Sequence, residues 1–165
     1  MTAFNSSDFR RILGHYPTGI CAITAMKDGA PVGMVVGSFT SVSLDPPLVA
    51  FFPDRNSTSW PKIEAAGRFC VNVLGAQQQD VCKALSSKSD NKFDAVRYRL
   101  SSQGLPIVSG SVAWIECELD TVHEAGDHFI VIGRVHALDL EHDHRPLLFF
   151  QGGYGQFSTL MHEVL

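Results

Sequence analysis

Residues 18–39 read TGICAITAMKDGAPVGMVVGSF, two apolar runs separated by Lys27-Asp28-Gly29-Ala30. An Asp-Gly pair between runs of β-forming residues is typical of a tight hairpin, because both residues accept the positive φ angles of the turn. The stretch therefore predicts two antiparallel strands, at 18–26 and 31–39. Strands that pair with their neighbours along the chain favour an antiparallel sheet.

Similar apolar runs continue along most of the chain, while helical patterns are short and few. We expect further strands at 43–52, 69–74, 111–125, 127–140 and 146–150, a loop at 87–110, and helices capped at Ser6-Ser7, at 59–66 and at 77–86. Because the helices do not alternate regularly with the strands, a mainly β, antiparallel barrel with a few peripheral helices is favoured over a doubly wound parallel sheet. The G-x-G-x-x-G turn of dinucleotide-binding folds is also missing.

Composition narrows the class of protein. The chain has 165 residues, of which 45% are hydrophobic and eleven are Phe. This length suits one domain with its own core, so we expect a single domain over residues 1–165. Only 18% of the residues are charged, below the roughly 25% of an average soluble chain, which favours a homodimer. The net charge of −4 argues against a nucleic-acid partner.

The cysteines and the N-terminus indicate a compartment. Cys21, Cys70, Cys82 and Cys117 are widely spaced and form no C-x-x-C motif. We interpret them as reduced, mostly buried thiols. The N-terminal segment has no apolar run of the kind found in signal peptides, and no stretch approaches the ~18 apolar residues of a membrane span. We therefore expect a cytoplasmic protein without a membrane partner.

The stretch 33–41 has the chemistry of a flat-ligand surface. Gly33 and Gly37 allow a close approach, and Ser38, Thr40 and Ser41 offer hydroxyl and amide groups at a strand end. A flavin ring needs such a surface, with apolar flanks and backbone polar groups along one edge. An ordinary edge strand before a Pro-Pro turn explains the same residues.

The sequence RNSTSW at 55–60 places Arg55 and three hydroxyls at an expected helix start. Free backbone N–H groups and the positive end of the helix dipole favour a phosphate there. An ordinary N-cap, which needs only one hydroxyl, is the alternative.

Metal and nucleophile motifs are weak. His123 and His128 are one residue too far apart for H-E-x-x-H, and Gly126 interrupts any helix between them. His142 and His144 fit a solvated turn. Neither a G-x-S-x-G motif nor a Cys beside a His is present. We expect no metal site, and the sequence disfavours a hydrolase.

Five segments, taken together, resemble one family. They are PTG (17–19), GSFTSVSLDPPL (37–48), RNSTSW (55–60), GDH (126–128) and PLLFFQGGY (146–154). In this order and spacing the chain resembles the short-chain flavin reductases, the small components of two-component flavin-dependent monooxygenases, over roughly residues 9–157. The resemblance implies a split β-barrel homodimer with flavin near the subunit interface. It also implies hydride transfer from NADH or NADPH to FMN or FAD, and delivery of the reduced flavin to a separate monooxygenase.

The resemblance also implies roles for individual residues. His128 is expected to meet the nicotinamide nucleotide. Lys92 and Phe93 resemble a pair that assists the flavin's phosphate or tail, and Tyr154 is expected to help close the pocket. The residues expected to line the isoalloxazine are Met34, Val35, Val36, Gly37, Ser38, Thr40 and Ser41, and those expected near the phosphate are Arg55, Ser57 and Ser59.

Two other functions fit the same features. A non-enzymatic flavin carrier would keep the serines at 57 and 59 and would not need His128. A flavin-dependent oxidase of the pyridoxamine-phosphate-oxidase type would need a basic cluster for the substrate phosphate, and only Arg55 and Lys92 are candidates. FMN and FAD, and NADH and NADPH, stay open as alternatives.

Overall fold

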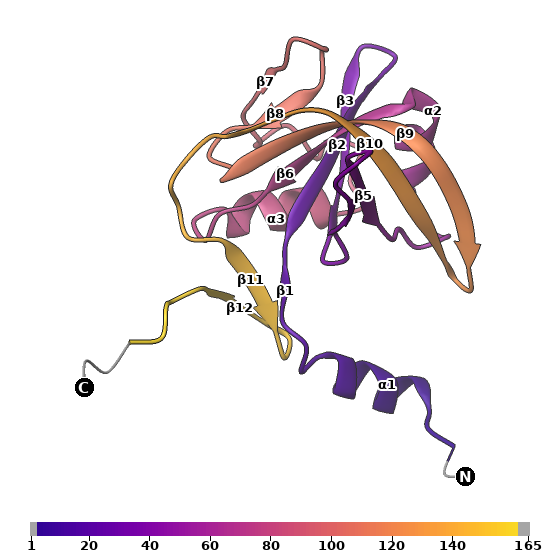
Figure 1. Ribbon diagram of the computed structural model, residues 1–165, viewed down its shortest axis with the longest axis vertical. Coiled ribbons are helices and arrows are strands. Elements are labelled where there is room, and N and C mark those ends of the chain that lie inside the picture. Colours follow the sequence, from indigo (N-terminus) through magenta and orange to yellow (C-terminus); the bar gives the residue numbers. More distant parts are fainter. Residues whose placement is uncertain (1–2, 162–165) are drawn as a thin grey trace.

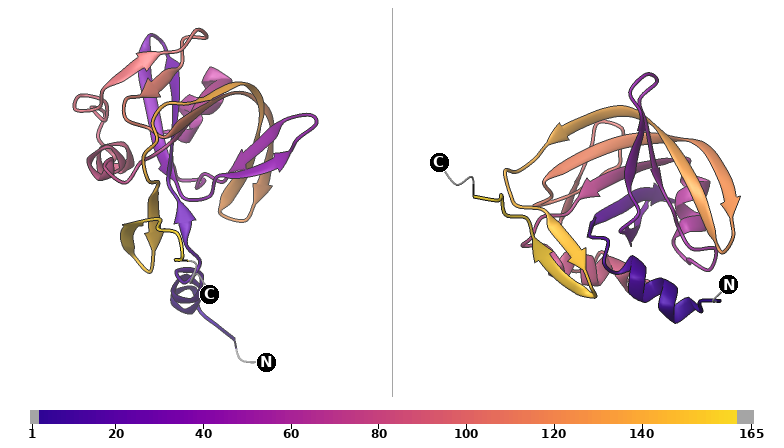
Figure 2. Two further views of the ribbon diagram at one scale, coloured as in Figure 1. Left: turned by 60° about the vertical axis from the view of Figure 1, so that its left-hand side comes forward. Right: turned by 60° about the horizontal axis from the view of Figure 1, so that its bottom comes forward.

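Seven antiparallel strands form the main sheet of the computed structural model, which describes residues 3–161. They are β2 (Cys21–Lys27), β3 (Ala30–Val36), β4 (Thr40–Ser43), β5 (Leu48–Phe51), β6 (Arg68–Val73), β9 (Ala113–Ala125) and β10 (His128–Leu140). Their spatial order is β3-β2-β6-β9-β10-β5-β4. The sheet curls around an interior but leaves β3 and β4 as free edges (Figures 1 and 2). This confirms the predicted mainly β fold with a split barrel.

A small sheet and one helix project from the barrel. β1 (Thr18–Gly19), β11 (Leu147–Phe150) and β12 (Gly153–Gln156) form this sheet in the order β1-β11-β12. Helix α1 (Ser6–Leu13) precedes it and lies at the lower end of the molecule in Figure 1. We call α1 and these three strands the extension. No residue of α1 is buried.

The remaining elements lie against the barrel. Helix α2 (Trp60–Ala66) contacts β2, β3 and β6, and helix α3 (Gln79–Ser86) contacts β3. β7 (Tyr98–Leu100) and β8 (Pro106–Val108) form a separate two-stranded sheet. Both helices therefore meet the free edge strand β3.

Two predicted boundaries are confirmed by backbone conformation. Asp28 and Gly29 have φ angles of 51° and 77° in the β2–β3 turn, as a tight Asp-Gly hairpin requires. In α2, Pro61 lies in the first turn and Gly67 ends the helix with a φ of 74°, a left-handed conformation that glycine adopts without strain.

Two predicted boundaries are wrong. Helix α1 is capped by Asn5 rather than by Ser6-Ser7, because the Asn5 side chain accepts a hydrogen bond from the Asp8 amide at 2.9 Å. The strand expected over 43–52 is interrupted, since β4 ends at Ser43 and β5 begins only at Leu48. The intervening Pro46 and Pro47 have no N–H group to offer a strand ladder.

The stretch 87–110 is not all loop, because it contains the β7–β8 hairpin. Each strand has only three residues, too few for a recognisable alternation. Buried side chains of the barrel hold the hairpin instead: Asn72 Oδ1 accepts from the Val108 amide at 2.9 Å, and Thr24 Oγ1 donates to the Pro106 carbonyl at 2.6 Å. Asn72 Nδ2 in turn donates to Thr24 Oγ1 at 3.0 Å.

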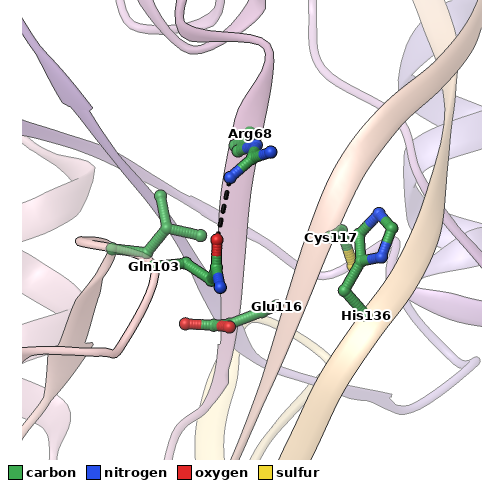
Figure 3. A pocket seen from close by; sticks show the side chains of 6 residues that line it. Arg68, Gln103, Glu116, Cys117 and His136 are labelled. Atoms are coloured by element: carbon green, nitrogen blue, oxygen red, sulfur yellow. Dashed lines mark hydrogen bonds between the residues drawn. The ribbon is translucent and has the colours of Figure 1, made fainter.

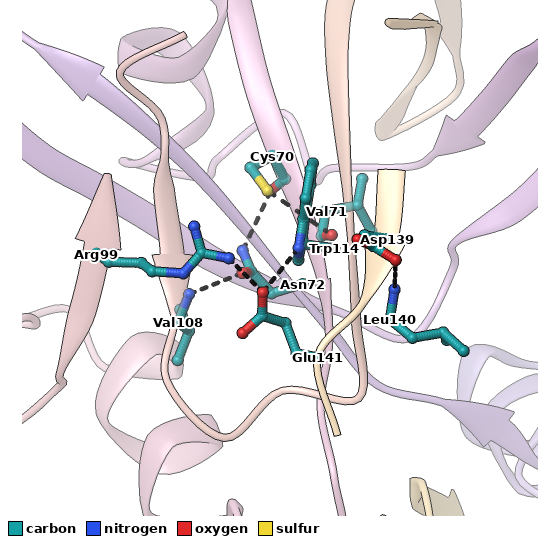
Figure 4. A network of polar contacts seen from close by, with 9 residues as sticks. All are labelled: Cys70, Val71, Asn72, Arg99, Val108, Trp114, Asp139, Leu140 and Glu141. Atoms are coloured by element: carbon teal, nitrogen blue, oxygen red, sulfur yellow. Dashed lines mark hydrogen bonds and ion pairs between the residues drawn. The ribbon is translucent and has the colours of Figure 1, made fainter. Parts of the chain in front are cut away.

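A second polar contact holds the same hairpin. Glu141 accepts a hydrogen bond from Trp114 Nε1 at 2.9 Å and pairs with Arg99 of β7 (Figure 4). Polar contacts between distant segments, rather than local apolar pattern, therefore place β7 and β8.

Aromatic side chains fill the interior of the barrel. Phe51 and Phe69 meet edge to face with ring centroids 5.2 Å apart, and Trp60 packs on Phe51 at 5.7 Å. All three are at most 2% exposed. Gly133 makes room for this packing, because a Cβ there would lie 2.5 Å from the Phe69 ring. Since Trp60 begins α2, burial of its ring fixes the segment just before it, which carries the predicted phosphate-binding serines.

The four cysteines are buried and unpaired, as predicted. Burial raises the pKa of Cys21, Cys70 and Cys117 to about 12. These three thiols therefore stay protonated at neutral pH, and only a thiolate is a good nucleophile.

Candidate functional site

One hollow of about 200 Å³ brings predicted residues together from three separate segments. It lies between β3, the chain before α2 and the end of α3. Five of the predicted site residues line it, namely Met34, Val35, Ser57, Ser59 and Lys92. Strand β3 thus provides one wall, and the serine segment faces the end of α3.

The two serines of this hollow are arranged as hydrogen-bond donors. Ser57 Oγ accepts from the amides of Ser59 and Trp60 at 3.3 and 3.1 Å. Ser59 Oγ accepts from Lys92 Nζ at 2.8 Å. A hydroxyl has one hydrogen and two lone pairs, so these contacts use acceptor positions and leave both hydrogens to donate. Two such donors suit an anion.

Lys92 supplies charge rather than a free donor. Its ammonium group donates to the Gly33 carbonyl at 3.0 Å, to Ser59 Oγ at 2.8 Å and to the Leu85 carbonyl at 3.1 Å. All three N–H bonds are therefore in use. Burial, and then the charge of Lys62, lowers the pKa of Lys92. Lys92 thus fastens β3, the serine segment and α3 together, and its charge lies beside the Ser59 hydroxyl.

A second hollow of about 180 Å³ adjoins the first and shares Thr58, Ser59, Lys88 and Lys92 with it. Phe93 lines this second hollow and packs on β3, where a Cβ at Gly33 would lie 3.0 Å from its ring. Lys62 and Lys88 line this hollow as well, and neither was predicted from the sequence. For Lys62 the signal was available, because it lies three residues after Ser59 at the start of a helix, a spacing that puts both on one face.

The turn between β9 and β10 holds His128 in a defined orientation. Gly126 has a φ of 61°, and the Asp127 carboxylate lies 2.7 Å from His128 Nδ1. This hydrogen bond lowers the pKa of Asp127. An ionised carboxylate can only accept, so Nδ1 carries the proton and Nε2 is left as an acceptor in the neutral ring. Adjacent side chains on a strand point apart, and the contact forms because Asp127 belongs to the turn.

Arg55 is turned toward the same turn and does not line either hollow. Its Nε donates to the Gly126 carbonyl at 2.8 Å, and its guanidinium lies 3.2 Å from the Glu124 carboxylate. We expected Arg55 near a phosphate at Ser57 and Ser59. Its side chain instead contacts the β9–β10 turn.

Comparison with known proteins identifies the family of the chain. A family model described as a flavin reductase like domain matches residues 13–158. The chain belongs to this family.

Individual members of the family are similar over nearly the whole chain. A flavin reductase of Pseudomonas putida is 60% identical over 160 residues, covering 96% of this chain and 94% of that protein. The nitrilotriacetate monooxygenase component B homolog of Mycobacterium thermoresistibile has a TM-score of 0.89 at 43% identity, with 96% and 93% of the chains covered. The NADH:FAD oxidoreductase of Streptomyces globisporus C-1027, solved with NAD and FAD fragments, has a TM-score of 0.87 at 32% identity, with 96% and 98% covered. The predicted family is confirmed.

The remaining predicted residues of this flavin reductase-like chain line neither hollow. Val36 is 6% exposed and belongs to the barrel core, so only its backbone can face a ligand. Ser38 Oγ accepts from the Phe52 amide at 3.0 Å. Gly37 approaches Thr18, whose Oγ1 a Cβ at position 37 would meet at 3.0 Å. Thr40 and Ser41 are exposed on β4.

Tyr154 lies in the extension, apart from the serine hollow. Its hydroxyl is 3.5 Å from Cys82 Sγ, on α3. It lines a separate hollow of about 380 Å³ with Pro17, Leu148 and Phe150. Within one chain, Tyr154, which we expected to help close the pocket, therefore lines neither of the hollows that contain Ser59.

A further hollow of about 290 Å³ contains none of the predicted residues (Figure 3). Arg68 donates to Gln103 Oε1 at 2.9 Å at its side. Glu116 lines it and is 2% exposed, and among residues 3–161 neither of its carboxylate oxygens has a hydrogen-bond partner.

Two features are absent from the described part of the chain. Between residues 3 and 161, no helix is long and apolar enough to cross a membrane. In the same range, no three His, Cys, Asp or Glu side chains are grouped so that they could hold a metal ion.

Proposed function

We propose that this protein transfers a hydride from NADH or NADPH to FMN or FAD and passes the reduced flavin to a separate monooxygenase. The observation that carries the proposal is the donor pair Ser57 and Ser59, backed by the Lys92 ammonium 2.8 Å from Ser59 Oγ. A flavin phosphate is an anion that needs such donors. Helix α2 has only seven residues, so the two hydroxyls carry the argument rather than the helix dipole.

The protein's task in this reaction is positioning. Nicotinamide and flavin supply the hydride chemistry between them, so no general base is required. Met34 and Val35 on β3 provide the wall against which the isoalloxazine lies, with the edge residues Val36 to Ser41 beyond it. Ser57 and Ser59 hold the phosphate end, which fixes how far the ring can slide along β3. Accurate placement of the two rings is the main source of rate in such a reaction.

His128 orients the nicotinamide. With Nδ1 bonded to Asp127 at 2.7 Å, the neutral ring presents a lone pair at Nε2. The carboxamide N–H of nicotinamide is a suitable donor to that lone pair. Contact with a phosphate would require a proton on Nε2, so we assign His128 to the carboxamide.

The working unit is a homodimer in the cytoplasm, and the whole chain acts as one domain. Support for the dimer comes from the extension, where Phe9, Ile12 and Leu13 are more than half exposed. Such a run of apolar surface is typical of an interface. The unpaired thiols of the barrel fit a reducing compartment. In the dimer, Tyr154 closes the flavin pocket from the extension.

The decisive experiment measures oxidation of NADH and of NADPH with FMN, FAD or riboflavin and no organic substrate. Oxidation with at least one flavin is expected. If neither nucleotide is oxidised with any flavin, the reductase proposal fails and a carrier function takes its place.

A paired variant tests the phosphate assignment. Ser57→Ala with Ser59→Ala should weaken FMN far more than riboflavin, which has no phosphate. Loss of hydrogen bonds to a charged group costs about 1.5–3 kcal/mol each, or roughly ten- to a hundredfold in affinity. Ser102→Ala, on an exposed loop, is the control. Equal weakening of FMN and riboflavin would place the phosphate elsewhere.

A further inference from the structure

We propose that Arg55 is a positioning residue, which ties the turn bearing His128 to the segment bearing Ser57 and so sets the nicotinamide site against the flavin site. This inference rests on the proposed function. It replaces the phosphate contact that the sequence suggested for Arg55.

Arg55 contacts the β9–β10 turn through three groups. Its backbone amide donates to the Asp127 carbonyl at 2.9 Å, and its Nε donates to the Gly126 carbonyl at 2.8 Å. Its terminal nitrogen lies 3.2 Å from the Glu124 carboxylate. One residue thus holds both sides of the turn from which His128 emerges.

The same side chain connects the turn to helix α2. The Arg55 guanidinium lies 5.1 Å from the centroid of the Phe129 ring, within the range of a cation–π contact. The Phe129 ring lies 6.5 Å from the ring of Trp60, and the Trp60 amide donates to Ser57 Oγ at 3.1 Å. A continuous path of contacts therefore leads from the turn to the Ser57 hydroxyl.

Backbone pairing supports the same path. Asp54 and His128 form an antiparallel bridge, and the Phe129 amide donates to the Pro53 carbonyl at 2.9 Å. The chain before Arg55 is therefore attached directly to the strand that carries His128.

The surroundings of Arg55 disfavour a role as phosphate ligand. Its charge is paired with Glu124, whose carboxylate would repel an approaching phosphate. Arg55 also lines neither of the hollows that contain Ser59. Lys92 provides the charge there instead, 2.8 Å from Ser59 Oγ.

The test compares nicotinamide and flavin responses of Arg55→Met and Arg55→Lys. In both, the KM for NADH should rise roughly five- to tenfold, the effect of losing one positioned hydrogen bond. The dissociation constants of FMN and riboflavin should each stay within about twofold of wild type, since neither hollow loses a donor. Glu124→Gln should have a smaller effect, because exposed ion pairs contribute little. Arg134→Met, on β10 but outside the site, is the matched control.

Hydrogen exchange adds a readout that does not depend on activity. In Arg55→Met, the amides of residues 124–129 should exchange faster, while β2 and β6 should be unchanged. Absence of NADH oxidation by the wild-type protein would contradict the proposed function. Even then, hydrogen exchange would show whether Arg55 holds the β9–β10 turn.

Three results would overturn the inference. A loss of FMN affinity with riboflavin unaffected would make Arg55 a phosphate ligand after all. If both variants bound FMN and riboflavin more weakly, had a KM for NADH raised by the same factor and had a lower Tm, Arg55 would contribute only to general stability. Unchanged exchange at 124–129 would show that the turn keeps its position without Arg55.

Discussion

The barrel and helix α1 of the extension use the same kinds of apolar side chains in opposite ways. In the barrel, Phe51 and Phe69 are 0% and 1% exposed, while in the extension Phe9 and Ile12 are 53% and 55% exposed. The barrel therefore carries its own core. Helix α1 of the extension leaves its apolar side chains exposed in the single chain, which supports the proposed dimer.

Contacts within helix α1 stabilise it. Asn5 and Asp8 form a capping box, and Asp8 lies 3.7 Å from Arg11 one turn later. An eight-residue helix is marginal by itself in water. Its stability in the protein should therefore depend on what its apolar face contacts in the proposed dimer.

The largest expected effect is on assembly. Phe9→Asp with Ile12→Asp should convert the dimer to a monomer whose barrel is still folded. Each apolar side chain contributes about 1.5–3 kcal/mol when buried, so the dissociation constant should rise more than about a hundredfold. Light scattering across protein concentrations measures this, with Ser7→Asp on the same helix as control. A variant that stays dimeric would show that α1 is not in the interface.

The next effect is confined to the barrel. Phe69→Ala should lower the free energy of unfolding by about 3–5 kcal/mol, because it leaves a cavity among rings that cannot collapse. Phe9→Ala, measured on the dissociated chain, should change it by less than about 0.5 kcal/mol. Urea denaturation compares the two variants. Similar losses would contradict the division into a self-sufficient barrel and an extension that depends on its partner.

A smaller effect concerns the β7–β8 hairpin. Asn72→Ala should lower the free energy of unfolding by about 1–3 kcal/mol, since it leaves the buried Val108 amide without an acceptor. Faster hydrogen exchange over residues 98–108 should accompany this loss, with the extension unchanged. Asn91→Ala, an exposed amide, is the control. Normal protection of β8 in Asn72→Ala would mean that the apolar contacts of the hairpin suffice.

The smallest expected effect is a pH dependence that reports on the barrel. Burial raises the pKa of Cys21 from 9.0 to about 12, so its thiol stays protonated in the folded chain while the unfolded chain ionises. This contribution to stability is complete below pH 9 and is lost as the pH rises toward 12, by about 1.4 kcal/mol per pH unit. Denaturation between pH 8 and 10 should show a shallower loss for Cys21→Ala than for wild type. Equal slopes would show that this thiol is not protected.

The features that sequence predicted are those with a local cause. Asp28-Gly29 defines the β2–β3 hairpin within four residues, and Pro61 with Gly67 marks both ends of α2. The place before that helix indicated hydroxyls for a phosphate, and the family resemblance assigned this role to Ser57 and Ser59. The structure adds contacts that occupy acceptor positions of the two hydroxyls and leave their hydrogens to donate.

The features that sequence missed depend on distant contacts. The β7–β8 hairpin is held by Asn72, and the orientation of Arg55 is set by the carbonyl of Gly126, 71 residues away. Neither partner can be read from the pattern around the residue concerned. The position of Tyr154 has the same cause, because its partner Cys82 lies on α3, 72 residues earlier.

The three hydrogen bonds of the Lys92 ammonium have a consequence for how quickly a ligand is exchanged. A lysine normally loses rotamer entropy when it closes on a ligand, but this side chain is already held by Gly33, Ser59 and Leu85. Binding of a flavin at the proposed site would therefore cost little reorganisation, and its departure would leave no N–H bond of Lys92 to be satisfied again. The fixed positive charge of Lys92 attracts an anion, but no N–H bond of its ammonium group is free to donate to that anion. A short residence time is what a protein needs if its product must leave for another enzyme.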